Sequence, residues 1–165
     1  MPSSPNTPAV LDRIKTMAQG VQVSGSNFFA AGNVKVGRFK DIRDNLPAFE
    51  VVLGPKDETK RRTAGGAPVV GGRIDDVQDF TFEVTLPYSD ADSEEVESIT
   101  LPSIRDALTK MFHASANLGL PGQVQSNRIV GDNGEYLYVV RGSEVYRVYR
   151  NVLHVTYEYS VVMTP

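Results

Sequence analysis

The sequence predicts an α+β fold, in which two amphipathic helices pack on one face of a mostly antiparallel sheet and one long loop interrupts the strands. Two observations support this prediction. Apolar residues recur at helical spacing in two separate segments, and several other segments alternate apolar and polar side chains with period two. At 165 residues the chain is long enough to bury one core, so we expect a single domain over residues 1–165.

The first helix is expected at residues 7–19, in "TPAVLDRIKTMAQ". Thr7 is the expected N-cap, Pro8 suits the first turn, and Gly20 is expected to end the helix. The second helix is expected at residues 101–115, in "LPSIRDALTKMFHAS". Apolar residues in both segments recur three and four positions apart, so each helix has one face that can pack against the sheet.

Three strands are clearest in the sequence, near residues 49–53, 80–88 and 153–162. The last of them, within "NVLHVTYEYSVV", places leucine, valine and tyrosine on one side and polar residues on the other, which is typical of a half-buried strand. Shorter strands are expected between residues 123 and 150, separated by turns at 132–134 and 141–143.

Residues 54–78 mix charge, glycine and proline without any period, which predicts a loop of unusual length for a single domain. Its glycines make ordering costly in conformational entropy. We therefore expect this loop to be mobile in an isolated subunit and to become ordered only against a partner.

The net charge of −3 hides an uneven distribution. Residues 1–73 hold 11 Lys or Arg against 6 Asp or Glu, whereas residues 74–165 hold 6 against 14. A basic cluster in the loop stands against an acidic belt over residues 75–97, which contains no Lys or Arg. Solvated surface is one interpretation, and docking of one copy on the next is the other. The candidate contact residues are Lys56, Lys60, Arg61, Arg62, Asp75, Asp76 and Asp79.

Motifs for catalysis are missing from the sequence. With no cysteine and only two histidines, the usual zinc-binding patterns cannot be built. The glycine-rich "GGAPVVGG" lacks the Gly-Lys-Ser/Thr ending of a phosphate loop, and "VSGSN" lacks the spacing of a serine nucleophile. We therefore expect no catalytic residue, no cofactor and no metal ion, and we expect His113 simply to end a helix.

His154 lies on the polar side of the last strand, with Glu158 further along the same side. An acid–base pair and a solvated or interface contact all fit this placement. Six of the seven tyrosines lie in the last 30 residues, but the arginines there are balanced by carboxylates, which argues against specific nucleic-acid binding. Tyrosine also suits a sheet that is partly buried by another subunit.

The N-terminal "MPSSPNTPAV" lacks the basic and apolar regions of a secretion signal, and no apolar stretch of membrane-spanning length occurs in the sequence. We therefore expect a protein that does not enter membranes and that is found in the cytoplasm.

The order of elements resembles that of the tail-terminator, or tail-completion, proteins of long-tailed bacteriophages, from about Thr7 to Val162. The resemblance rests on "DFTFEVTLPY", "LPSIRDALTKMF" and "VYRVYRNVLHVTYEYSVV". It implies a structural virion protein that forms a ring, typically a hexamer, at the head-proximal end of the tail tube and stops tube polymerisation.

The same resemblance implies the partners of the chain: further copies of itself, the tail-tube protein and the head–tail connector protein, with DNA passing through the ring. It also implies a location in the virion tail after assembly in the host cytoplasm. Two alternatives remain open at the level of the sequence. One is another virion part, either a tail-tube subunit or a head–tail adaptor, and the other is a small-ligand binding domain with a pocket between sheet and helices.

Overall fold

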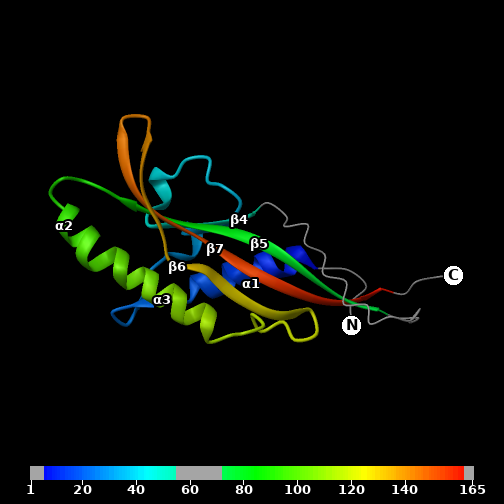
Figure 1. Cartoon of the computed structure of the whole chain (residues 1–165). Coiled ribbons are helices and arrows are strands. Elements are labelled where there is room, and N and C mark those ends of the chain that lie inside the picture. Colours follow the sequence, from blue (N-terminus) through cyan, green and yellow to red (C-terminus); the bar gives the residue numbers. More distant parts are fainter. Residues whose placement is uncertain (1–5, 55–71, 162–165) are drawn as a thin grey trace.

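The computed structural model describes residues 6–54 and 72–161, and in this part of the chain it has an α+β fold (Figure 1). The elements follow in the order α1 (Thr7–Gln19), β1 (Gln22–Val23), β2 (Ser26–Asn27), η1 (Ala31–Asn33), β3 (Val34–Val36), η2 (Arg43–Asn45), β4 (Ala48–Leu53), β5 (Gly72–Pro87), α2 (Ser93–Glu95), η3 (Val96–Thr100), α3 (Leu101–His113), β6 (Val124–Arg141) and β7 (Glu144–Val161). The main sheet has the order β3-β4-β5-β7-β6, and only the β3–β4 pair is parallel. The predicted fold class is confirmed.

Helix α1 spans the predicted residues, but its N-cap is Asn6 rather than Thr7. The side chain of Asn6 accepts a hydrogen bond from the backbone N–H of Ala9 at 3.2 Å, which satisfies one of the free donors of the first turn. Gly20 caps the other end, as predicted, and its N–H donates to the carbonyl of Met17 at 3.0 Å. The predicted N-cap is therefore wrong by one residue, because sequence patterns place helix ends only to within a residue or two.

Strands β5 and β7 pair without a gap along all 16 residues of β5. The sequence predicted this strand to start near residue 80 and assigned residues 72–78 to the long loop. That assignment is wrong, because β7 supplies backbone hydrogen-bond partners along this stretch despite its charge and glycine content. The rest of the predicted loop, 55–71, lies outside the described residues.

Strand β6 runs straight through residues 132–134, where the sequence predicted a turn. The register against β7 shifts here, so this stretch is a bulge inside one long strand. Gly134 has a φ of +62°, and a Cβ at this position would lie 2.5 Å from the ring of Tyr149, so glycine is required. The predicted turn at residues 141–143 is confirmed, since it joins β6 to β7 as a hairpin.

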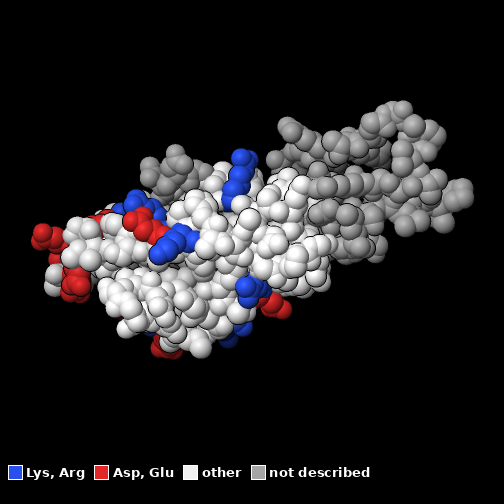
Figure 2. All heavy atoms as spheres, turned by 90° about the horizontal axis from the view of Figure 1, so that it is seen from below, with Lys and Arg blue, Asp and Glu red and all other residues white. Residues whose placement is uncertain are grey.

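The second helix begins earlier than predicted, because α2 and the π-helical turn η3 lead directly into α3. The predicted segment 101–115 matches α3 apart from its last two residues. The acidic stretch before it, which the sequence placed in the acidic belt, is helical from Ser93 onward. Carboxylates suit this position because the N-terminal end of a helix carries partial positive charge. Acidic side chains gather over this end of the molecule (Figure 2).

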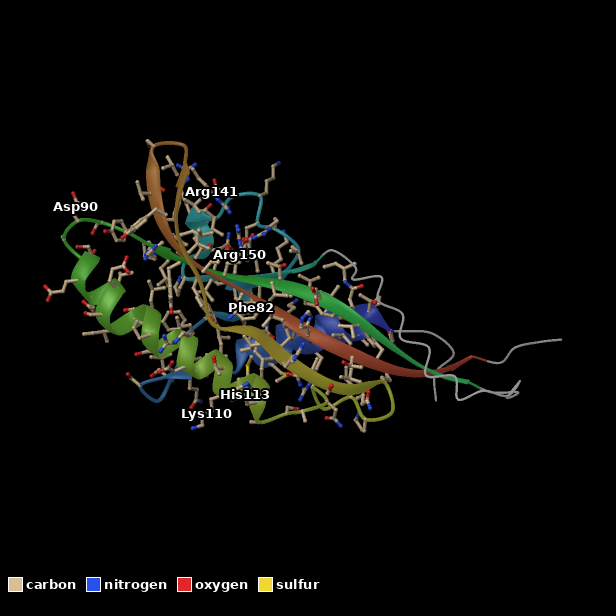
Figure 3. The ribbon with its side chains drawn as sticks, viewed as in Figure 1. Phe82, Asp90, Lys110, His113, Arg141 and Arg150 are labelled. Carbon is tan, nitrogen blue, oxygen red and sulfur yellow. The ribbon has the colours of Figure 1, made fainter. Side chains whose placement is uncertain are left out.

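Both helices pack on one face of the sheet, as predicted, and a single apolar cluster fills the space between them. Phe82 lies within this cluster (Figure 3), with its ring centroid 5.8 Å from that of Phe49 and 5.5 Å from that of Phe112. The cluster also includes Val10, Ile14 and Ala18 of α1, Ile104 and Leu108 of α3, and Leu153, Val155 and Tyr157 of β7. The predicted apolar side of the last strand is therefore buried where its side chains are described.

The other face of the sheet is crossed at one end by residues 37–47, which connect β3 to β4. Ala48 precedes Phe49 in an extended strand and therefore points to this second face. Here it forms a small cluster with Ile42 and Tyr146, against which Phe39 and Leu46 pack. We call residues 37–47 the crossing segment.

Candidate functional site

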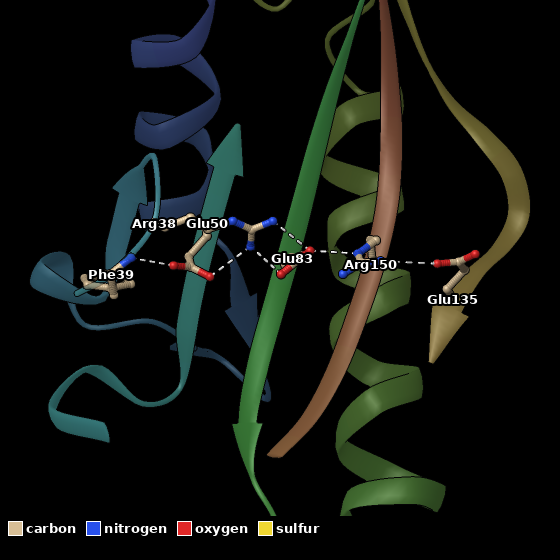
Figure 4. Close-up of polar contacts among 6 residues, drawn as sticks. All are labelled: Arg38, Phe39, Glu50, Glu83, Glu135 and Arg150. Carbon is tan, nitrogen blue, oxygen red and sulfur yellow. Dashed lines mark hydrogen bonds and ion pairs between the residues drawn. The ribbon is translucent and has the colours of Figure 1, made fainter. Parts of the chain in front are cut away.

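A row of ionic side chains crosses the second face of the sheet beside the crossing segment (Figure 4). Glu50 on β4 and Glu83 on β5 are register partners, and their exposed fractions are only 1% and 3%. Arg38 of the crossing segment bridges them, with Nη1 at 3.1 Å from Glu50 Oε2 and Nη2 at 2.8 Å from Glu83 Oε1. Arg150 Nε lies 2.7 Å from Glu83 Oε1, and Arg150 Nη1 lies 3.7 Å from Glu135 Oε2. We call these five side chains the ionic row.

The ionic row attaches the crossing segment to the sheet. Two buried carboxylates directly opposite each other would repel, and the two arginines offset this repulsion. Burial by itself would raise the pKa of Glu83, but hydrogen bonds and charge from Arg38 and Arg150 hold that pKa below its usual value. The backbone N–H of Phe39 also donates to Glu50 at 2.5 Å. Because both carboxylates are engaged in this way, we assign the row a structural role.

The sequence motifs did not predict the ionic row, although its two buried carboxylates could have been recognised from the sequence. Glu50 and Glu83 are the single charged residues in "AFEVVL" and "FTFEVT", and a buried carboxylate requires a cation nearby. The cation could not be read in the same way, since Arg38 lies 45 residues from Glu83 in the chain.

His154 faces Asp79 across the β5–β7 pair, and its Nδ1 contacts the Asp79 carboxylate. The sequence had suggested Glu158 as its possible acid–base partner, but Glu158 stands opposite Asp75 in the register and its side chain is not among those described. Within the described residues, no group of three or more His, Asp or Glu side chains is arranged to hold a metal ion. The contact between His154 and Asp79 joins two strands, and we assign it no chemistry.

The acidic belt predicted over residues 75–97 is divided between β5 and the segment that follows it. Asp75, Asp76 and Asp79 belong to the first half of β5, whereas the acidic residues from Asp90 onward follow the end of that strand. From Asp79 to the end of β5 at Pro87 the strand covers about 26 Å at about 3.3 Å per residue, which separates the two groups. The acidic stretch is therefore divided along the strand, and the contact role of Asp75, Asp76 and Asp79 stays a prediction. The four predicted basic contact residues, Lys56, Lys60, Arg61 and Arg62, lie outside the described residues.

Exposed carboxylates gather instead where the second helix begins (Figure 2). They belong to Asp90, Asp92, Glu94 and Glu95, which we call the acidic end. The hydroxyl of Ser89 donates to Asp92 at 2.6 Å, while the carboxylate of Asp90 has no ion-pair partner among the described residues. Asp90 stands at the outermost turn of this end (Figure 3).

The β6–β7 hairpin is anchored beside the acidic end by Arg147. Its Nε and Nη2 lie 2.5 Å and 3.0 Å from the two carboxylate oxygens of Glu97 in η3. Tyr138 donates to the same carboxylate at 2.8 Å, and the guanidinium carbon of Arg147 lies 4.1 Å from the centre of the Tyr138 ring. Hydrogen bonding to Arg147 lowers the pKa of Glu97, while hydrogen bonds with Tyr88 and Glu97 raise the pKa of Tyr138 to about 12. The hairpin base is therefore held by an ion pair that persists at neutral pH.

The tip of this hairpin is apolar and exposed. Val140 and Val145 are register partners on either side of the turn, with exposed fractions of 67% and 39%. An open recess lies between the hairpin, η2 and the turn after β5, and its lining includes Leu46, Pro87, Tyr88, Asp90, Glu144 and Val145. Exposed apolar side chains next to carboxylates are typical of a protein–protein contact. The valines that flank the "RGS" turn were a sequence signal for this surface, but the recess joins three distant segments.

The comparisons with known proteins do not assign a family. No protein-family model matches the chain, and a search of curated proteins finds no matching sequence. No helix among the described residues is both long and apolar enough to cross a membrane.

Proposed function

We propose that this protein is a structural subunit of a long-tailed phage virion, which forms a hexameric ring at the head-proximal end of the tail tube. In this role it ends tube polymerisation and joins the tail to the head connector, without catalysis or a cofactor. The observation that carries the proposal is the difference between the two ends of β5. One end adjoins the acidic end and the recess, and the other continues beside β7 beyond the last residue of β4.

A closed ring of identical subunits with head-to-tail contacts needs two different, mutually complementary patches on each copy. The acidic end and the exposed hairpin tip provide one patch at one end of the molecule. The opposite end carries the paired extension of β5 and β7, which Figure 1 shows reaching beyond the helices. Two ends of different structure, one with the acidic end and hairpin tip and the other with a two-stranded extension, favour head-to-tail contacts over a symmetric pair.

The interior of the fold also fits a structural role better than a ligand-binding one. Apolar side chains fill the space between the helices and the sheet, where a small-ligand binding domain would need its pocket. The ionic row and the Arg147 anchor hold the crossing segment and the hairpin to this core. A rigid subunit with a filled core and exposed ends is suited to repeated contacts with other subunits.

Native mass spectrometry of the purified protein, followed by electron microscopy, tests the proposal. We expect closed rings of one size that bind to the ends of assembled tail tubes and prevent further growth. Polymerisation of the protein into long tubes would identify a tail-tube subunit instead. A protein that stays monomeric at concentrations of tens of micromolar, with or without tail tubes, would contradict the ring.

A further inference from the structure

We propose that the recess beside the acidic end binds the basic segment of a neighbouring copy, which contains Lys60, Arg61 and Arg62. This inference rests on the proposed ring and names the two surfaces that meet within it. The recess is built entirely from described residues, and its occupant is identified by charge and by chain length.

The recess has the chemistry to accept a long basic side chain. Asp90 and Glu144 line it together with Leu46, Pro87 and Tyr88, and the Glu144 carboxylate also accepts a hydrogen bond from the Tyr146 hydroxyl. Its only lining cation, Arg43, is already paired with Asp41 at 3.3 Å. Lysine and arginine bury their aliphatic stems on apolar surface while their charged ends meet carboxylates. The recess therefore matches lysine or arginine better than it matches an acidic or purely apolar group.

The sequence between β4 and β5 offers a matching partner. Its "KDETKRR" stretch holds four basic and two acidic residues, with Lys60, Arg61 and Arg62 in succession, and "APVV" follows shortly after it. The basic residues complement Asp90 and Glu144, and the valines complement the exposed Val140 and Val145 of the hairpin tip. The segment thus offers both opposite charge and apolar side chains to the recess and the neighbouring hairpin tip.

Chain length disfavours the same copy as the source of this segment. Gly54 bonds to the carbonyl of Asp79, and from there the recess lies about 25 Å along β5, while Gly72 lies about 50 Å from the recess at the other end of that strand. A path that visits the recess between these two glycines is about 75 Å long. The 18 peptide steps between them reach at most about 65 Å. The backbone of one copy thus falls about 10 Å short of its own recess, which favours another copy as the source of the segment.

A charge swap tests the electrostatic part of the contact. The double variant Asp90→Lys and Glu144→Lys is expected to raise the protein concentration required for ring assembly at least tenfold. Adding Lys60→Glu and Arg61→Glu to the same chain is expected to restore at least half of that loss, because the two charges have been exchanged. Rings that assemble as well in the double variant as in the parent would overturn the contact, and so would a fourfold variant that is weaker still.

Because the chain contains no cysteine, introduced cysteines can test directly whether the recess of one copy contacts the basic segment of another. Two differently tagged chains are mixed under oxidising conditions, one carrying Ser143→Cys in the recess and the other carrying Thr63→Cys beside the basic cluster. We expect a disulfide-linked mixed dimer, in at least tenfold excess over a control mixture in which Thr16→Cys of α1 replaces Ser143→Cys.

The outcomes separate this inference from the ring itself. Rings that form without the mixed dimer would overturn the recess contact and leave the proposed function in place. A chain with both cysteines that cross-links only within one copy, with no gain in mass, would also overturn the contact. A parent protein that forms no ring would overturn both.

Discussion

Glu50 and Glu83 lie directly opposite each other on β4 and β5, nearly fully buried, and the guanidinium of Arg38 bridges the two carboxylates. This relationship decides how the crossing segment is attached to the sheet. Removal of one charge from such a group leaves another buried charge without its partner, which costs more than the intact group contributes. The ionic row is therefore the place where a single substitution has the clearest consequence.

Replacement of Arg38 by methionine is expected to lower the free energy of unfolding by about 2 kcal/mol. The value lies below that of a fully buried ion pair because the Arg38 side chain is 43% exposed and solvent screens its charge. Urea unfolding at neutral pH measures the change. Lys40→Met is the matched control, since it removes an exposed cation from the same segment, and a change below about 0.5 kcal/mol is expected there. Equal effects of the two substitutions would refute the stabilising role of the Arg38 bridge.

The pKa of Glu83 predicts how stability depends on pH. This pKa is lower in the folded protein than its usual value, so the ionised group stabilises the fold above the unfolded pKa of about 4.5 and loses that contribution as the pH falls through the folded value. We expect the parent to lose more stability between pH 7 and pH 3 than Glu83→Gln does. Urea titrations at the two pH values measure this difference, and parallel losses in both proteins would contradict the assignment.

Gly134 is expected to tolerate no other residue without loss of stability. Alanine would need a positive φ and would place its Cβ 2.5 Å from the Tyr149 ring and 2.7 Å from the carbonyl of Arg150. We expect Gly134→Ala to destabilise the protein by about 2 kcal/mol or more in thermal unfolding. Gly142→Ala is a useful comparison, because it also has a positive φ but open space around its Cβ position, so a smaller loss is expected.

Phe82 and Leu108 are fully buried in the cluster between the sheet and α3. Replacement of either by alanine is expected to lower the free energy of unfolding by about 2 to 5 kcal/mol, since each substitution leaves a cavity. Denaturant unfolding monitored by circular dichroism measures both losses. A loss below about 1 kcal/mol at both positions would contradict the packing.

Reversal of Lys60, Arg61 and Arg62 to glutamate is expected to reduce ring formation and attachment to tails while the subunit stays folded. The parent ring is also expected to weaken at 1 M salt, where the Debye length falls to about 3 Å. Native mass and tail-completion assays measure both effects. Reversal of Lys15, Lys40 and Lys110 changes the net charge equally and is expected to leave assembly intact. Equal loss of assembly in the two triple variants would show that net charge governs the ring, and normal assembly of the Lys60, Arg61 and Arg62 variant would refute the basic contact.

Local patterns in the sequence were sufficient to determine the fold class, both helices and the inward faces of the main strands. The spacing of Val10, Ile14 and Ala18 predicted the buried face of α1, and the alternation from Phe80 to Leu86 predicted the buried face of β5. These features depend on neighbours a few residues away, because side-chain direction repeats every 3.6 residues in a helix and every two in a strand.

Tertiary structure alone decided where long-range partners meet. Residues 72–78 read as a loop by composition, yet β7 pairs with them, and residues 132–134 read as a turn, yet the bulge in β6 absorbs them. The bridge from Arg38 to Glu83 and the recess that joins Leu46, Asp90 and Val145 unite segments far apart in the chain. The physical reason is that backbone groups and buried charges need partners, and those partners can come from any segment that the fold brings near. The spacing of residues along the sequence does not show which distant segments become neighbours.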